Sequence, residues 1–227
     1  QSYSNSGALY PTNNTAIGFY ALYNNQPTNT TTGDENTAVG SSSLYSNTTG
    51  RWNTATGYNS LYSNLTGFYN VANGARALDA NTSGNSNVAV GVTSLFNNTS
   101  GSFNFAGGGS ALFNNNASYN VAVGHQALYE NTSGEENIAI GYQAMNSNTL
   151  GNNNTAIGQN ALYSMVNAYG NTAVGSNAMY SNTGGVNTAV GVNSMYSGLG
   201  VRGNTAVGAY TMQNNTWWRY NMGNDER

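Results

Sequence analysis

The residues that could perform acid–base or nucleophilic chemistry are few in this chain. His125 is the only histidine, cysteine is absent, and Asp and Glu together number eight. If the chain folds into the stacked coils described below, Asp79 lies three coils before His125, roughly 14 Å along the axis at the usual strand spacing. The two side chains cannot then form a direct catalytic dyad, and we expect His125 to be a solvated turn residue.

Two acidic pairs, Asp34-Glu35 and Glu135-Glu136, are the next candidates. Six coils separate them, roughly 29 Å, which is too far for the paired carboxylates of glycoside hydrolysis. One pair together with backbone oxygens could hold calcium, but the Gly/Asp nonapeptide of calcium-binding rolls is absent. We therefore expect no enzyme activity, no metal site and no cofactor, and interpret the pairs as charges that keep turns soluble.

An aromatic and cationic cluster, Trp217-Trp218-Arg219-Tyr220, lies near the end of the chain. Such a group could stack on sugar rings or on another chain. A cap over the last coil is the simpler interpretation, because a stack of repeats must cover its end. We expect residues 217–227 to form a C-terminal cap or contact segment.

A phrase of about 17 residues, N-T-A-V-G-x-x-A-L-Y-x-N-T-x-G-x-x, recurs through nearly the whole chain. Ten of the eleven spacings between copies are 16 or 17 residues, and the first is 22 because of a loop insertion near residues 26–32. This regularity indicates stacked coils, one structural unit per phrase. The copies begin at Asn14, Asn36, Asn53, Asn70, Asn87, Asn104, Asn120, Asn137, Asn154, Asn171, Asn187 and Asn204.

One coil can be interpreted by numbering the phrase from its Asn. Positions 2 to 4 and positions 8 to 10 have the length and composition of short strands, whereas Gly at position 5 and the N-T-x-G segment suit corners. The predicted fold is an all-β parallel β-solenoid, or β-roll, of about 12 coils with a 17-residue repeat and two short strands per coil. It spans residues 14–216, and residues 1–13 precede it as an N-terminal cap or exchange arm.

Alternation along a strand puts position 3 on one face of the sheet and positions 2 and 4 on the other. Position 3 is Ala in all twelve copies, and position 9 is Leu eight times and Met four times. A small residue facing a large one across a thin core fills space without voids. The predicted core ladder comprises Ala38, Leu44, Ala89, Leu95, Ala139, Met145, Ala189 and Met195.

Position 4 is then left on the outside, although it is mostly Val or Ile. Through twelve coils this stripe would run for roughly 58 Å and exceed the apolar area usually exposed on a monomer. We therefore expect self-association, as a parallel homotrimer or an end-to-end filament. The predicted interface ladder comprises Val39, Val90, Val123, Ile140, Ile157, Val174, Val190 and Val207.

Charge and hydropathy exclude several partners and locations. Charged residues make up 6% of the chain, lysine is absent and the net charge is −3, so we expect no binding to nucleic acid. No apolar run approaches the roughly 20 residues of a membrane span, so we expect no membrane insertion. The start at Gln1, without Met or an apolar leader, suggests a processed, secreted chain located outside the cell or on its surface.

Eleven N-x-S/T sequences occur, and such sequences are acceptors for N-glycosylation where they lie on a surface. The simplest interpretation is that they are a by-product of turns rich in Asn and Thr.

The phrase N-T-A-V-G-x-x-A-L resembles the head repeats of trimeric autotransporter adhesins and the N-T-A-x-G arrays of bacterial surface proteins and phage tail fibres. The resemblance covers about residues 14–221 and implies an extracellular fibrous head or stalk that serves attachment or assembly. A cell-surface glycan or host receptor would then be a partner. The best matches are Asn36-Thr37-Ala38-Val39-Gly40, Asn87-Val88-Ala89-Val90-Gly91, Asn137-Ile138-Ala139-Ile140-Gly141 and Asn187-Thr188-Ala189-Val190-Gly191.

These observations favour a structural or adhesive fibre protein that assembles from identical subunits and mediates surface attachment or scaffolding. Two alternatives remain open. Thr at position 2 in seven of twelve coils could order water, as on an ice-binding solenoid. The terminal aromatic cluster could instead belong to a carbohydrate-binding solenoid.

Overall fold

Each copy of the phrase contributes one β-strand of three residues, at its positions 2 to 4. The computed structural model describes residues 13–26, 32–198, 200, 202–214, 220 and 222–224. They belong to two units, residues 1–116 and residues 117–227. The described part of the chain is all β and contains no helix, which confirms the predicted parallel β-solenoid with its 17-residue repeat.

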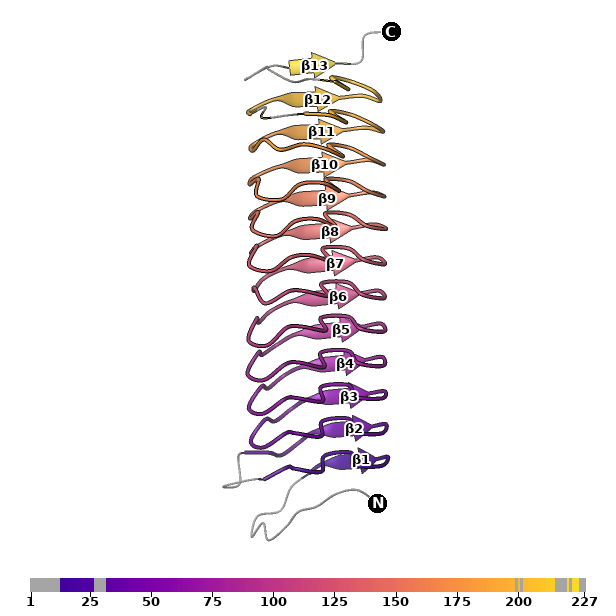
Figure 1. The fold of residues 1–227 in the computed structure, drawn as a ribbon, viewed down its shortest axis with the longest axis vertical. Helices are drawn as coiled ribbons and strands as arrows, with labels where there is room; N and C mark the ends of the chain where they lie inside the picture. Colours follow the sequence, from indigo (N-terminus) through magenta and orange to yellow (C-terminus); the bar gives the residue numbers. More distant parts are fainter. Residues whose placement is uncertain are drawn as a thin grey trace. The chain divides into compact units, whose positions relative to one another are not determined.

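Within each unit the strands pair in parallel with their neighbours in sequence (Figure 1). Like positions face like positions, as in Ala38 opposite Ala55 and Ala139 opposite Ala156. The first unit contains β1 (Thr15–Ile17), β2 (Thr37–Val39), β3 (Thr54–Thr56), β4 (Val71–Asn73), β5 (Val88–Val90) and β6 (Phe105–Gly107). The second contains β7 (Val121–Val123), β8 (Ile138–Ile140), β9 (Thr155–Ile157), β10 (Thr172–Val174), β11 (Thr188–Val190), β12 (Thr205–Val207) and β13 (Met222–Asn224).

The Asn at position 1 links each coil to the next in both units. The backbone N–H of Asn53 donates to the side-chain Oδ1 of Asn36 at 3.0 Å, and that of Asn154 donates to Oδ1 of Asn137 at 3.0 Å. These asparagines are buried, where a polar group without a partner is costly. The ladder therefore satisfies buried amides and fixes the register of the coils together.

The Gly at position 5 is required for two reasons. Gly40 has φ = +133° and Gly141 has φ = +136°, a region that residues with a Cβ avoid. A Cβ added to Gly40 would meet the carbonyl group of Gly57 in the next coil, and one added to Gly141 would meet that of Gly158. The corner thus needs both a left-handed backbone and close approach between coils.

The prediction of a second strand at positions 8 to 10 is wrong, because the structure has one strand per coil. Positions 6 to 11 form turns in which positions 7 and 9 are left-handed, as in Ser42 (φ = 56°) and Leu44 (φ = 50°). The N–H of Ser42 donates back to Phe19 at 2.8 Å, whereas that of Leu44 donates forward to Ser60 at 3.0 Å. The segment is hydrogen-bonded between coils without being extended.

Because this segment is not a strand, its side chains do not alternate between two faces. Positions 8 and 9 both lie in the core, as in Ala127 and Leu128, whereas a strand there would have placed them on opposite faces. The core of each unit therefore holds three columns: Ala at position 3, Ala or Ser at position 8 (Thr only at Thr211) and Leu or Met at position 9. All eight residues of the expected core ladder are fully buried, namely Ala38, Leu44, Ala89, Leu95, Ala139, Met145, Ala189 and Met195.

Several expected segments lie wholly or mostly outside the described residues. They are residues 1–12 of the N-terminal cap or arm, residues 27–31 of the loop insertion, and most of residues 217–227. Within that last range, β13 pairs in parallel with β12.

Candidate functional site

The outward face of the second unit carries a continuous apolar ladder at position 4. Its members are β-branched in six successive strands and lie in register, as in Ile140 opposite Ile157. Five of the six side chains keep between 38% and 47% of their surface exposed, and Val174 is half-buried. We call this set the outward ladder; it comprises Val123, Ile140, Ile157, Val174, Val190 and Val207.

The corresponding positions of the first unit do not form a continuous apolar ladder. Thr56 in β3, Asn73 in β4 and Gly107 in β6 interrupt the column. Val39 in β2 is half-buried and Val90 in β5 is 43% exposed. The predicted interface ladder thus has two members in the first unit and six in the second, and only those six are consecutive.

Thr residues at position 2 run beside the outward ladder over four of its strands. Thr155 faces Thr172, and Thr188 faces Thr205, in the parallel register. All four are half-buried. On the face opposite the core, β9 to β12 therefore carry a column of Thr side chains beside a parallel column of Val and Ile side chains.

Aromatic side chains at position 10 stack from coil to coil. Tyr163, Tyr180 and Tyr196 have ring centroids 5.1 and 5.0 Å apart, with planes within 7° of parallel. Burial raises the pKa of the Tyr180 hydroxyl above its ordinary value, and the neighbouring Tyr163 and Tyr196 hydroxyls raise it further. In the first unit Tyr23, Tyr45 and Tyr62 stack in the same way, as do Phe96 and Phe113.

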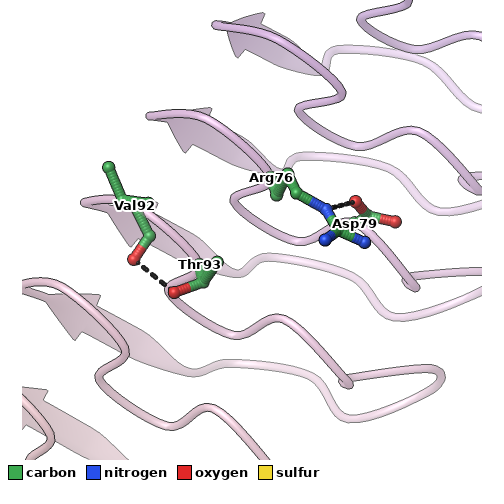
Figure 2. Close-up of polar contacts among 4 residues, drawn as sticks. All are labelled: Arg76, Asp79, Val92 and Thr93. Atoms are coloured by element: carbon green, nitrogen blue, oxygen red, sulfur yellow. Dashed lines mark hydrogen bonds and ion pairs between the residues drawn. The ribbon is translucent and has the colours of Figure 1, made fainter.

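Asp79 interrupts the aromatic column of the first unit, and the guanidinium group of Arg76 lies at this point. Arg76 donates from Nε to Oδ2 of Asp79 at 2.9 Å (Figure 2). Its guanidinium carbon lies 4.4 Å from the ring centroid of Phe96 in the next coil. In the coil that contains Phe96, Thr93 donates its hydroxyl to the carbonyl of Val92 at 2.7 Å (Figure 2). The Arg76–Asp79 pair therefore replaces an aromatic ring in the column.

A second aromatic cluster of the first unit was not anticipated from the sequence. Trp52 stacks on Tyr69 with centroids 4.6 Å apart, and Arg51 lies 4.0 Å from the Trp52 ring. The Trp52 indole also donates to the carboxylate of Glu35. Aromatic residues just before the position-1 Asn in successive copies were the available signal for this second column.

The residues considered for catalysis are not brought together among the described residues. His125 is exposed and stacks on Tyr142 at 5.9 Å between ring centroids. Glu135 and Glu136 line a polar hollow with Ser133, Asn152 and Asn153. Over the described ranges no three His, Asp or Glu side chains gather where they could hold a metal ion.

Of the terminal aromatic cluster, only Tyr220 falls within the described residues, where it is 83% exposed. Its backbone N–H donates to the carbonyl of Arg202 at 3.1 Å. Trp217, Trp218 and Arg219 lie outside the described residues. In the described part of the chain no helix is long and apolar enough to span a bilayer.

The sequence interpretation also missed a second buried Asn ladder, at position 12. Asn64 donates from Nδ2 to Oδ1 of Asn47 at 2.8 Å and to the carbonyl of Gly67 at 3.1 Å. Asn81 repeats the pattern on Asn64 at 2.8 Å. The signal was present in the N-T-x-G segment, which resembles a polar surface turn although its Asn is fully buried.

Comparison with protein-family models, with curated proteins and with solved structures finds no match. What is established is therefore a β-solenoid with repeats of about 17 residues and stacked Asn ladders.

Proposed function

We propose that the chain is a subunit of an extracellular fibre, and that identical chains associate side by side through the outward ladder of the second unit. The observation that carries this proposal is the run of six consecutive β-branched residues on the face opposite the core. Soluble monomers rarely leave contiguous apolar patches of this kind exposed.

An energy estimate supports association through this face. Full burial of a Val or Ile side chain stabilises by about 1.5–3 kcal/mol, so covering a remaining exposed fraction of about 40% contributes about 0.6–1.2 kcal/mol. Five such residues on each of two chains contribute about 6–12 kcal/mol, compared with an association cost of about 4–15 kcal/mol. The ladder thus offsets much of the cost, and association should depend on concentration.

The resemblance of the repeat to adhesin heads and tail fibres supports the same role. In this proposal the assembly is parallel, with three chains placing their outward ladders toward a common axis. The scarcity of charge agrees with a face that packs against its own copy, because like charges would otherwise meet across the interface. Attachment to a surface or scaffolding of other proteins would be the function of the assembled fibre.

The test compares two variants that the chain itself suggests. Ile140→Thr with Ile157→Asn introduces into the second unit the residue types that the first unit carries at Thr56 and Asn73. Because the fold accommodates both types at position 4, circular dichroism should be unchanged. Sedimentation velocity over a range of concentrations should show oligomers of the unmodified chain and a monomer for this variant.

The matched control is Val39→Thr, the same kind of change in the interrupted column of the first unit. It should leave the oligomer intact. The proposed assembly would be refuted if the unmodified chain stayed monomeric at high concentration and formed no fibres in electron micrographs. Oligomers that persist equally in both variants would place the interface elsewhere.

A second candidate function is the ordering of water or ice. The specific observation is the Thr ladder at Thr155, Thr172, Thr188 and Thr205, which runs beside the outward ladder on a regular parallel sheet. Repeated hydroxyl and methyl groups on such a face could hold a water lattice. Measurable thermal hysteresis in a solution of the monomeric Ile140→Thr, Ile157→Asn variant, lost on changing Thr172→Lys, would favour this function over assembly.

A further inference from the structure

The N-x-S/T sequences of this chain divide into two structural groups. Five of the eleven have their Asn at position 12 of a coil, and those five side chains are fully buried. Others have an exposed Asn, and Asn153 in Asn153-Asn154-Thr155 is an example. The buried group comprises Asn47, Asn64, Asn81, Asn98 and Asn131.

In the buried group, the side-chain nitrogen to which a glycan would be attached already donates hydrogen bonds. The Nδ2 of Asn47 donates to Oδ1 of Asn25 at 2.7 Å and to the carbonyl of Gly50 at 3.0 Å. The Nδ2 of Asn81 donates to Asn64 at 2.8 Å and to Gly84 at 3.1 Å. An amide NH₂ has two hydrogens, so each of these nitrogens already uses both.

The space around these nitrogens is also closed. A Cβ added to Gly67 would meet the Oδ1 of Asn64, the carbonyl of Gly84 in the next coil and the Nδ2 of Asn81. A site that cannot accept one methyl group cannot accept a sugar ring. The folded coil therefore excludes a glycan at position 12 both by hydrogen bonding and by volume.

N-glycosylation would attach the sugar before this ladder forms, because the transferase acts on unfolded chain. The Asn Nδ2 forms a bond to the anomeric carbon of a lipid-diphosphate-linked oligosaccharide. The bond from that carbon to the diphosphate oxygen breaks, and one Nδ2 proton leaves. The product has lost one of the two hydrogens that the ladder requires and carries a bulky polar group.

We propose that N-glycosylation at any of these five asparagines and folding of the coils exclude one another. At Asn47, Asn64, Asn81 or Asn98 a glycan would leave the Oδ1 of the preceding Asn without its donor. At Asn131 it would disrupt the bond from Nδ2 to the carbonyl of Gly134. The chain then reaches its folded state only where these sequences are not modified. This inference is independent of the proposed function, since it concerns the buried side of the coil.

The test expresses the chain in the secretory pathway of a eukaryotic cell that N-glycosylates its cargo. The secreted, protease-resistant fraction and the retained fraction are separated, and occupancy at each Asn is measured by mass spectrometry after enzymatic deglycosylation in heavy-oxygen water. We expect glycans at the five buried positions in the retained fraction only. Asn153 is the internal control and should be modified in both fractions.

A variant that removes the acceptor sequences without touching the ladder sharpens the test. The changes Thr49→Ala, Thr66→Ala, Ser83→Ala, Ser100→Ala and Ser133→Ala lie at the third residue of each sequence, which is exposed or half-buried. The variant should be secreted in the folded state with a several-fold higher yield. Made in the bacterial cytoplasm, it and the unmodified chain should give equal yields.

Two outcomes would overturn the proposal. One is a folded, protease-resistant molecule with a glycan at any of the five positions. The other is an unchanged secreted yield for the five-substitution variant while the unmodified chain is glycosylated at these positions.

Discussion

The two units have the same core but opposite defects in their ladders. In the first unit the Asn ladder at position 12 continues from Asn25 to Asn115, whereas the outward position-4 column is interrupted. In the second unit the outward ladder is continuous, but Met165 takes the place of Asn at position 12. There Asn182 donates at 3.3 Å to the sulfur of Met179 instead of to a ladder partner in the preceding coil.

The difference shows that one repeat can supply either hydrogen bonds between its own coils or an apolar surface for another chain. Buried amides give the first unit an internal polar ladder, in which each coil fixes its neighbour. The second unit lacks part of that ladder and exposes apolar groups that a second chain could cover. Internal stabilisation thus predominates in one unit and potential for assembly in the other, although the phrase is the same.

The largest expected effect comes from breaking the ladder of the first unit. Asn81→Leu removes the donor to Oδ1 of Asn64 and the acceptor of Asn98, and each buried polar group left unsatisfied costs about 1–3 kcal/mol. The free energy of unfolding, measured by urea denaturation, should fall by about 2–6 kcal/mol. Met165→Leu, at the same position in the second unit, should cost less than about 1.5 kcal/mol. Equal losses in the two variants would contradict the comparison.

The next effect concerns the outward column. Thr56→Val together with Asn73→Val makes position 4 apolar from β1 to β5 in the first unit and extends the surface available for association. We expect the dissociation constant of the oligomer to fall about tenfold, the equivalent of about 1.4 kcal/mol. Sedimentation equilibrium would measure it, and Thr54→Val, which changes position 2 alone, is the control. No change with the double variant would mean that the first unit takes no part in the interface even when its column is apolar.

A smaller effect is expected where the aromatic column is interrupted. Asp79→Tyr should restore stacking between Tyr62 and Phe96, and stacked aromatic pairs contribute about 0.5–1.5 kcal/mol. Loss of the exposed Arg76 ion pair offsets about 0–1 kcal/mol of this, so a net gain below about 1 kcal/mol is expected in thermal unfolding. Asn146→Tyr makes the corresponding change in the second unit. A loss of stability in both variants would show that the rings do not fit the column.

The smallest effect is a pH dependence of stability that arises from Tyr180 in the second unit. The pKa of Tyr180 is raised in the folded chain, so the folded state keeps a proton that the unfolded state releases above its ordinary pKa. The contribution of Tyr180 to the free energy of unfolding is therefore fully present below a pH of about 10, and it declines as the pH rises further. Tyr180→Phe should flatten this decline in alkaline urea titrations. A decline of the same slope in Tyr180→Phe would remove this residue as its cause.

Much of the solenoid could be predicted from the repeat. Ala at position 3 in every copy indicated a tightly filled interior. Asn recurs at position 1 of every copy, and this is the residue that forms an amide ladder between coils, as at Asn36 and Asn53. The outward ladder followed from strand alternation alone. The position-12 ladder was missed because the path of the turn decides which of its residues face inward. The stack of Trp52 on Tyr69 was missed because it depends on how surface turns of neighbouring coils align.

The sequence by itself determined the period, the all-β class and the columns of like residues, because a strict repeat leaves stacking as the only way to bury its apolar positions. Only the tertiary structure decided the path of positions 7 to 9. A left-handed Leu or Met costs about 1–2 kcal/mol by local preference alone, so short-range patterns predict an extended strand there. Burial of that side chain returns about 1.5–3 kcal/mol, and the left-handed path keeps hydrogen bonds to both neighbouring coils, as at Ser42 and Leu44.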